Sequence, residues 1–171
     1  TSANVTTIVF TDFNVGGSRA SEITSDIRIS SKSASVAADL EPEYIAVSAD
    51  STTAWVALQE NNAVAVIDLS DNSVDTILGL GYKNHAIIGN ELDASNRDDS
   101  INIRDWPVRG LYMPDTIDVY EYAGTNYLVS ANEGDGREYL TDEADAGACT
   151  AAGGFDFDDG DCFHYLDEIR L

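Results

Sequence analysis

The segment "EPEYIAVSADSTTAWVALQENNAVAVIDLSDNSVDTIL", from Glu41 to Leu78, gives the clearest structural signal in this sequence. It contains four short runs of β-branched and apolar residues, separated by the Asp-, Asn- and Ser-rich turns "SADST", "QENN" and "LSDNS". The runs are Tyr44 to Ser48, Ala54 to Gln59, Ala63 to Asp68 and Ser73 to Leu78. Four antiparallel strands of this length, joined by tight turns, predict one blade of a β-propeller.

A second segment repeats part of this pattern. "PEYIAVSADSTTAWVALQENNA" from Pro42 aligns with "PDTIDVYEYAGTNYLVSANEGD" from Pro114, which predicts strands at Thr116 to Tyr122 and Asn126 to Ala131. Self-similarity of this kind indicates a repeat architecture. A further run at Val5 to Phe10 also predicts a strand, and helical periodicity is hard to find elsewhere in the chain.

We therefore expect an all-β fold built from propeller blades of four antiparallel strands. Residues 1–140 would form about three blades, with a long connection at 79–113. Residues 141–171 are rich in Asp, Gly and Ala without a core-forming period, which predicts an acidic surface insertion. Cys149 and Cys162 would pin this insertion with a disulfide, although a metal site is the alternative. A disulfide favours an oxidising, extracytoplasmic compartment.

The net charge limits the partners of the chain. Nine basic and 31 acidic residues give a net charge of −22, which opposes binding to nucleic acid or anionic lipid. No run approaches the roughly 18 apolar residues that a membrane-spanning helix needs, so we expect no membrane insertion. The first residue is Thr1 and not Met, which fits removal of an upstream segment, although a chain shortened in another way would look the same.

Acidic and amide side chains occur at the ends of the repeated strands. Strand ends of a propeller gather on one face around the central axis, so these side chains should line one rim. Carboxylate and amide oxygens suit hard cations, Ca²⁺ first and Mg²⁺ second. The alternative is that they cap strand ends. Arg137 would separate the carboxylates or bind an anion. The predicted rim residues are Glu41, Glu43, Glu60, Asn61, Asn62, Asp115, Asn132, Glu133 and Asp135.

Two further acidic clusters are candidates for calcium. One lies in the long connection and comprises Asn90, Asp93, Asn96, Asp98 and Asp99. The other lies in "GFDFDDGDC" and comprises Asp156, Asp158, Asp159 and Asp161, although its spacing does not match an EF-hand. In both places an ordinary loop rich in Asx turns is the alternative.

Catalytic motifs are scarce in this sequence. His85 and His164 are the only histidines, and no GxSxG, HExxH or P-loop accompanies them. His85, beside Lys83, could act as a base or contact a phosphate, or it could be a hydrogen-bonded structural histidine. A metal-dependent phosphoesterase would need metal-held water and cations near the phosphoryl group. The available cationic side chains are Lys83, His85, Arg97, Arg104 and Arg137.

Three long motifs resemble a known family. They are "DLEPEYIAVSADSTTAWVALQENNAVAVIDL", "NELDASNRDDSINIRDWPVRGLYMPDTI" and "LVSANEGDGREY". Together they resemble the secreted bacterial choice-of-anchor I family, whose members are predicted seven-bladed propellers with YVTN-like repeats. The resemblance covers about residues 5–139 and implies part of a longer chain, completed by the remaining blades or another subunit.

The resemblance gives only general expectations for function. Family members are often labelled as surface glycoproteins or as alkaline-phosphatase-like, without a catalytic motif that maps onto this chain. We expect a secreted, calcium-associated propeller module that binds an extracellular ligand or has a structural role at the cell surface. The alternative is a metal-dependent phosphoesterase of alkaline-phosphatase type. The cysteine-bearing insertion departs from the family pattern, so the resemblance implies nothing about it.

Overall fold

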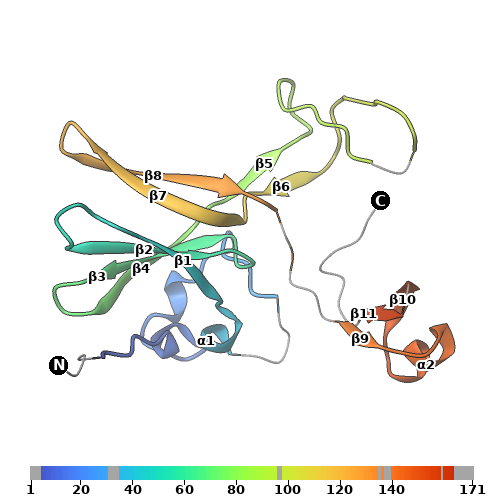
Figure 1. Ribbon diagram of the computed structural model, residues 1–171, viewed down its shortest axis with the longest axis horizontal. Helices are drawn as coiled ribbons and strands as arrows, with labels where there is room; N and C mark the ends of the chain where they lie inside the picture. The colour runs from blue at the N-terminus through green and yellow to red at the C-terminus, as the bar shows by residue number, and fades with distance from the viewer. Residues whose placement is uncertain are drawn as a thin grey trace. The chain divides into compact units, whose positions relative to one another are not determined.

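The computed structural model describes residues 5–30, 35–95, 98–134, 136, 140–158 and 160–163, and its described part is mostly β with few helices. The chain divides into two compact units. The first unit contains residues 1–91 and 105–135, and the second contains residues 92–104 and 136–171. Figure 1 shows the elements of each unit.

A four-stranded antiparallel sheet forms the centre of the first unit. Its strands are β1 (Pro42–Val47), β2 (Thr53–Leu58), β3 (Ala63–Asp68) and β4 (Ser73–Gly79), paired in chain order. They match the four runs predicted from the sequence to within two residues. The three connecting turns each contain a short polar residue at positive φ, namely Ser51, Asn62 and Asn72, because such residues tolerate the left-handed conformation better than bulky ones.

One face of this sheet packs against the N-terminal segment. Phe13 and Val36 from that segment join Val56, Leu58 and Ile77 of the sheet in a buried core. The segment contains two 3₁₀ turns, η1 (Thr11–Phe13) and η2 (Ala20–Glu22), and the short helix α1 (Val36–Asp39).

The strand predicted at Val5 to Phe10 is wrong. No strand is present there, and the chain instead turns into η1 through a hydrogen bond from the Phe13 N–H to the Phe10 carbonyl. Ile8 and Phe10 pack against the core, so their apolar character serves packing without strand pairing.

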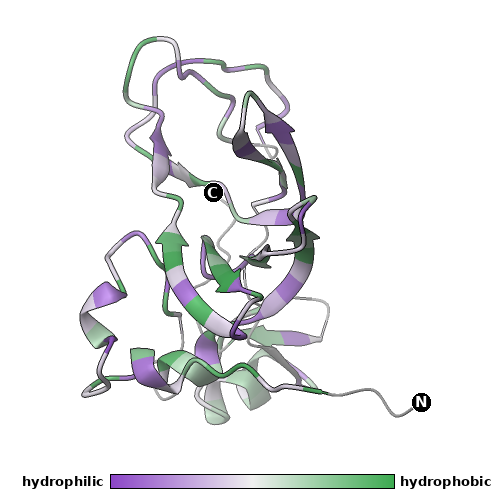
Figure 2. Ribbon diagram, turned by 90° about the vertical axis from the view of Figure 1, so that its left-hand side faces the viewer, coloured by the Kyte–Doolittle hydropathy of each residue, from purple (hydrophilic) through white to green (hydrophobic). Residues whose placement is uncertain are grey.

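A long hairpin covers the other face of the sheet. It consists of β7 (Pro114–Tyr122) and β8 (Thr125–Asn132), and its Ile117 packs with Ala46 of β1 and Ala57 of β2. Hydrophobic and hydrophilic bands alternate along the strand ribbons in Figure 2, as expected when successive side chains point to opposite faces.

The sequence repeat has a structural counterpart. The β1–β2 and β7–β8 hairpins both begin at a proline, and in both the register shifts just after it. Backbone conformations also correspond, because Ser51 and Ala123 have φ of 59° and 52° at equivalent turn positions. Asn62 and Gly134, which follow the second strands, have φ of 50° and 76°. The described residues contain no closed ring of sheets.

The long connection between the hairpins is partly structured. β5 (Tyr82–Asn84) and β6 (Arg109–Leu111) form a two-stranded antiparallel pair within it. Leu92 and Arg104 form an isolated antiparallel bridge in the second unit.

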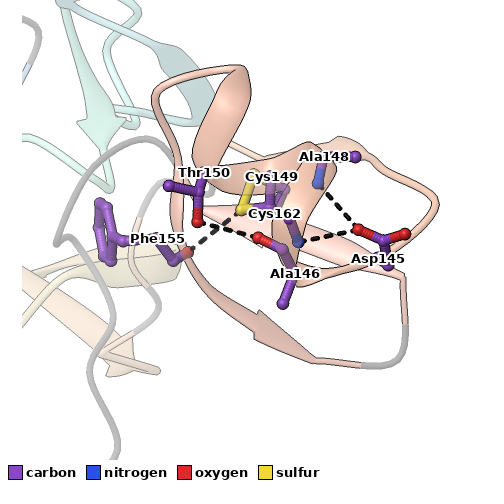
Figure 3. The surroundings of a disulfide bond; sticks show 8 residues. Asp145, Ala146, Ala148, Cys149, Thr150, Phe155 and Cys162 are labelled. Atoms are coloured by element: carbon purple, nitrogen blue, oxygen red, sulfur yellow. Dashed lines mark hydrogen bonds between the residues drawn. A yellow bond between two sulfur atoms is a disulfide. The ribbon is translucent and has the colours of Figure 1, made fainter.

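The cysteine-bearing segment has its own small sheet. β9 (Leu140–Asp142), β10 (Phe155–Asp158) and β11 (Asp161–Phe163) pair in the order β10-β11-β9, beside the helix α2 (Ala146–Ala151). The predicted disulfide is confirmed, and Cys149 of α2 and Cys162 of β11 are both buried. Figure 3 shows this bond beside Asp145, whose carboxylate caps α2. A disulfide can supply a buried centre where the sequence has no apolar period.

Candidate functional site

Acidic side chains from two hairpins meet at one end of the first unit. The register pairs Pro42 with Leu58 and Pro114 with Asn132, so each hairpin places the start of its first strand beside the end of its second. β7 contacts both β1 and β2, which brings the corresponding ends of the two hairpins together. The carboxylates at these ends, here called the acidic rim, are Glu41, Glu43, Glu60, Asp115 and Glu133.

The carboxylates of the rim affect one another electrostatically. Partial desolvation raises the pKa of Glu43 above its ordinary value, and the negative charges of Glu60, Asp115, Glu41 and Glu133 raise it further. A hydrogen bond also joins the two hairpins, from Gln59 Nε2 to Glu133 Oε2 at 2.8 Å. Most rim side chains are exposed, whereas Glu60 is half-buried. The rim is therefore a place where negative charge accumulates and where a cation would reduce repulsion.

Asn61 does not belong to the rim, and its prediction as a rim residue is wrong. Its side chain is fully buried and acts as a structural clamp. Asn61 Nδ2 donates to the Arg28 carbonyl at 2.8 Å and to Asp39 Oδ2 at 3.1 Å, while its Oδ1 accepts the Glu41 N–H at 3.1 Å. These bonds tie the N-terminal segment to the β2–β3 turn.

Asn62 is also fully buried, so its prediction as a rim residue is wrong for the same reason. Its Nδ2 donates to the Gly81 carbonyl at 2.8 Å and to the Asp26 carbonyl at 3.4 Å. Its Oδ1 accepts the N–H groups of Tyr112 and Met113 at 2.9 and 3.1 Å. One side chain thus joins the N-terminal segment to the residues that flank β5 and β6.

The rim contains the carboxylate oxygen ligands of a calcium site, but these ligands do not lie close enough together to bind an ion. Carboxylate oxygens are the ligands that Ca²⁺ and Mg²⁺ prefer. Among the described residues, however, no three His, Cys, Asp or Glu side chains lie close enough to hold a metal ion in this conformation. A bound cation would require the flexible glutamate side chains of the rim to adopt other rotamers.

The acidic loop of the second unit uses its carboxylates to bond its own backbone. Asp93 accepts the N–H groups of Ser95 and Asn102 at 3.5 and 3.0 Å, and Asp98 accepts the Ser100 N–H at 3.2 Å. The contacts with Ser95 and Ser100, each two residues further along the chain, are typical of Asx turns, whereas the contact with Asn102 closes the loop across nine residues. Asp98 also lines a cavity of about 260 Å³ within this loop.

Several predicted site residues lie outside the described part of the chain. Asp135 and Arg137 lie outside the described residues. Asp156 and Asp158 belong to β10, but their side chains fall outside the description.

His85 is held by the backbone of the long connection. Its Nδ1 lies 2.6 Å from the Asn90 carbonyl oxygen, so Nδ1 carries the proton and donates, because a carbonyl can only accept. The backbone of His85 bonds to Val108 and Trp106. Lys83 is exposed on β5. The histidine therefore has a structural partner on one nitrogen, and Nε2 remains an acceptor in the neutral ring.

The sequence analysis missed two arginines that line a cavity. Arg28 and Arg109 lie around it together with Tyr82, within the first unit. Their rarity was the available signal, since the chain has only nine basic residues. An isolated arginine in a sequence nevertheless gives no indication of which other arginine it will meet in the fold.

Comparison with known proteins places most of the chain in one family. The family model described as choice-of-anchor I domain matches residues 1–160. No curated protein and no solved structure matches the chain. In the described part of the chain, no helix combines the length and apolar character needed to cross a membrane.

Proposed function

The chain belongs to the choice-of-anchor I domain family, and we propose that it acts as a secreted, calcium-associated β-propeller module with a binding or structural role. Membership of this family points to association with the cell surface or the extracellular space. The buried Cys149–Cys162 disulfide supports an oxidising compartment. The acidic rim, built from two repeated hairpins, is the observation that carries the proposal.

Two features support propeller architecture. The β1–β4 sheet is an antiparallel meander of four strands, which is the build of one blade. The β7–β8 hairpin repeats the β1–β2 hairpin and packs face to face with it, as the first two strands of a neighbouring blade would. The remaining blades would come from further residues of a longer protein or from another subunit.

Charge supports a role for calcium at the rim. The raised pKa of Glu43 reflects partial desolvation together with repulsion from four other carboxylates. A divalent cation bound between these groups would replace repulsion with attraction and join the two hairpins. Ca²⁺ is preferred to Mg²⁺ because it accepts variable numbers of oxygen ligands in irregular geometry. Glu43, Glu60, Asp115 and Glu133 would then hold the ion.

Thermal unfolding with and without calcium tests this proposal. Calcium at about 100 times its Kd would stabilise the folded chain by about 2.7 kcal/mol. For a domain of this size, this stabilisation raises Tm by roughly 5–10 °C. EDTA should remove the increase, and Mg²⁺ should give a smaller one. Glu133→Gln should reduce the calcium response, meaning the increase in Tm on adding Ca²⁺, because it removes a rim charge. The new side chain keeps an oxygen that can accept the hydrogen bond from Gln59 Nε2.

Glu121→Gln is the matched control, because Glu121 is an exposed glutamate near the opposite end of the same hairpin. Its calcium response should equal that of the unaltered chain. An unchanged Tm on adding Ca²⁺, or equal effects of the two variants, would contradict calcium binding at the rim. Metal-dependent turnover of p-nitrophenyl phosphate that disappears in Glu133→Gln would instead indicate a phosphoesterase.

A further inference from the structure

A cavity on the first unit concentrates positive charge in a chain that has little of it. Its volume is about 460 Å³, within the range of roughly 300–1,000 Å³ that is usual for ligand sites. The N-terminal segment and the β5–β6 pair form its walls. The residues that carry its chemistry are Ser25, Asp26, Arg28, Tyr82, Arg109 and Leu111. Two guanidinium groups and one carboxylate give this lining a net charge of +1, against −22 for the whole chain.

Strand register positions Arg109 in the cavity. Tyr82 pairs with Leu111 and Asn84 pairs with Arg109, so Tyr82, Arg109 and Leu111 share one face of the β5–β6 pair. The Arg109 guanidinium carbon lies 4.2 Å from the centre of the Tyr82 ring. This cation–π contact limits the motion of the guanidinium group and leaves its N–H edges able to donate.

The buried Asn61 and Asn62 side chains hold the walls of the cavity in place. Asn61 bonds to the carbonyl of Arg28, and the Arg28 N–H donates to the Asn61 carbonyl at 2.7 Å. Asn62 bonds to the carbonyls of Asp26 and Gly81 on one side, and to the N–H of Tyr112, next to Leu111, on the other. The walls are thus fixed before a ligand arrives, which lowers the entropic cost of binding.

We propose that this cavity, here called the arginine pocket, binds the carboxylate of an acidic monosaccharide. A planar guanidinium group matches a carboxylate in shape and can donate two parallel hydrogen bonds to it. The Tyr82 ring and Leu111 offer an apolar surface to a sugar ring, and Ser25 and Asp26 can bond to its hydroxyl groups. The low net charge of the lining favours a monoanion over a dianion such as phosphate.

Isothermal titration calorimetry of the whole chain with D-glucuronate tests this inference. EDTA should be present, so that a calcium-binding rim does not affect the result. D-Glucuronate should bind, and D-glucose should bind at least about tenfold more weakly because it lacks the charged group. Arg109→Gln should raise the Kd for D-glucuronate by at least about tenfold, since it removes a charge-assisted hydrogen bond. Inorganic phosphate should bind more weakly than D-glucuronate.

Lys83→Gln is the matched control for Arg109→Gln. It removes the same charge from the same strand pair, but Lys83 pairs with Gly110 and lies on the opposite face from Arg109. The Kd of Lys83→Gln for D-glucuronate should match that of the unaltered chain. Circular dichroism should show that both variants fold. The inference fails if D-glucuronate gives no heat of binding, or if D-glucose or inorganic phosphate binds with a Kd equal to or lower than that of D-glucuronate. It also fails if the two variants weaken D-glucuronate binding equally.

Discussion

Substituting Asn62 by alanine should strongly destabilise the first unit, because this one side chain satisfies groups from three segments. Its three shortest hydrogen bonds reach the Gly81 carbonyl and the N–H groups of Tyr112 and Met113. A buried partner left unsatisfied costs about 1–3 kcal/mol. Because Gly81 and Tyr112 are half-buried, we take the lower half of that range, about 1–2 kcal/mol for each bond, or about 3–6 kcal/mol for the three bonds.

Backbone conformation adds a second cost. Asn62 has a φ of 50°, a left-handed conformation that costs alanine about 1 kcal/mol more than asparagine. The total of about 4–7 kcal/mol corresponds to a fall in Tm of roughly 8–28 °C. Tryptophan fluorescence during urea unfolding is a suitable assay, since both tryptophans of the chain, Trp55 and Trp106, lie in the first unit.

Two further variants separate the contributions. Asn72 has a φ of 60° and is exposed in the β3–β4 turn, so Asn72→Ala should cost only the conformational term of about 1 kcal/mol. Asn62→Gly removes the conformational term and should retain most of the loss. If Asn62→Ala is no more destabilised than Asn72→Ala, the hydrogen bonds of the buried side chain are not what holds these segments together.

Two other predictions concern the disulfide and the rim. A Cβ on Gly154 would overlap Cys162 Sγ and lie 2.9 Å from Cys149 Sγ, so Gly154→Ala should make the disulfide faster to reduce with dithiothreitol, measured by alkylation and mass. Gly153→Ala should speed reduction less, because its added carbon meets open space and only the φ of 85° strains the alanine. The raised pKa of Glu43 means that the folded chain binds this proton more tightly than the unfolded chain, so its contribution to stability is lost as pH rises through that pKa. In calcium-free urea unfolding, the free energy of unfolding should therefore fall less for Glu43→Gln than for the unaltered chain as pH rises from about 4 to about 7. Equal falls in the two proteins would contradict repulsion of Glu43 by the other rim carboxylates.

Local patterns predicted the central sheet well. The strands of β1–β4 pair with their neighbours in sequence, so alternation and turn residues contain most of the information that defines them. Val5 to Phe10 has the same apolar composition, but a strand also needs an edge to pair with, and composition does not specify one. In the cysteine-bearing segment, local patterns predicted no strand or helix, yet the structure contains both. Its buried centre depends on a covalent bond between α2 and β11, which apolar periodicity does not reveal.

The turn "QENN" shows why a polar cluster is hard to interpret before the fold is known. Glu60 belongs to the rim, whereas the next two side chains, Asn61 and Asn62, are fully buried and bond to backbone groups of distant segments. The direction of a side chain after a strand depends on backbone conformation, and Asn62 has a positive φ. The sequence shows three consecutive polar residues, but it does not show that the first side chain lies at the rim while the next two point into the interior.

The same turn links the two proposed sites physically. Glu60 places charge at the rim, and Asn62 holds the carbonyls of Asp26 and Gly81, which line the arginine pocket. Loss of Asn62 should therefore weaken D-glucuronate binding as well as lower Tm, although Asn62 does not line the pocket. Glu133→Gln should reduce the calcium response and leave D-glucuronate binding unchanged, because Glu133 lies on the other hairpin and does not line the pocket. This pattern of effects would separate a clamp that shapes the pocket from charges that bind a cation.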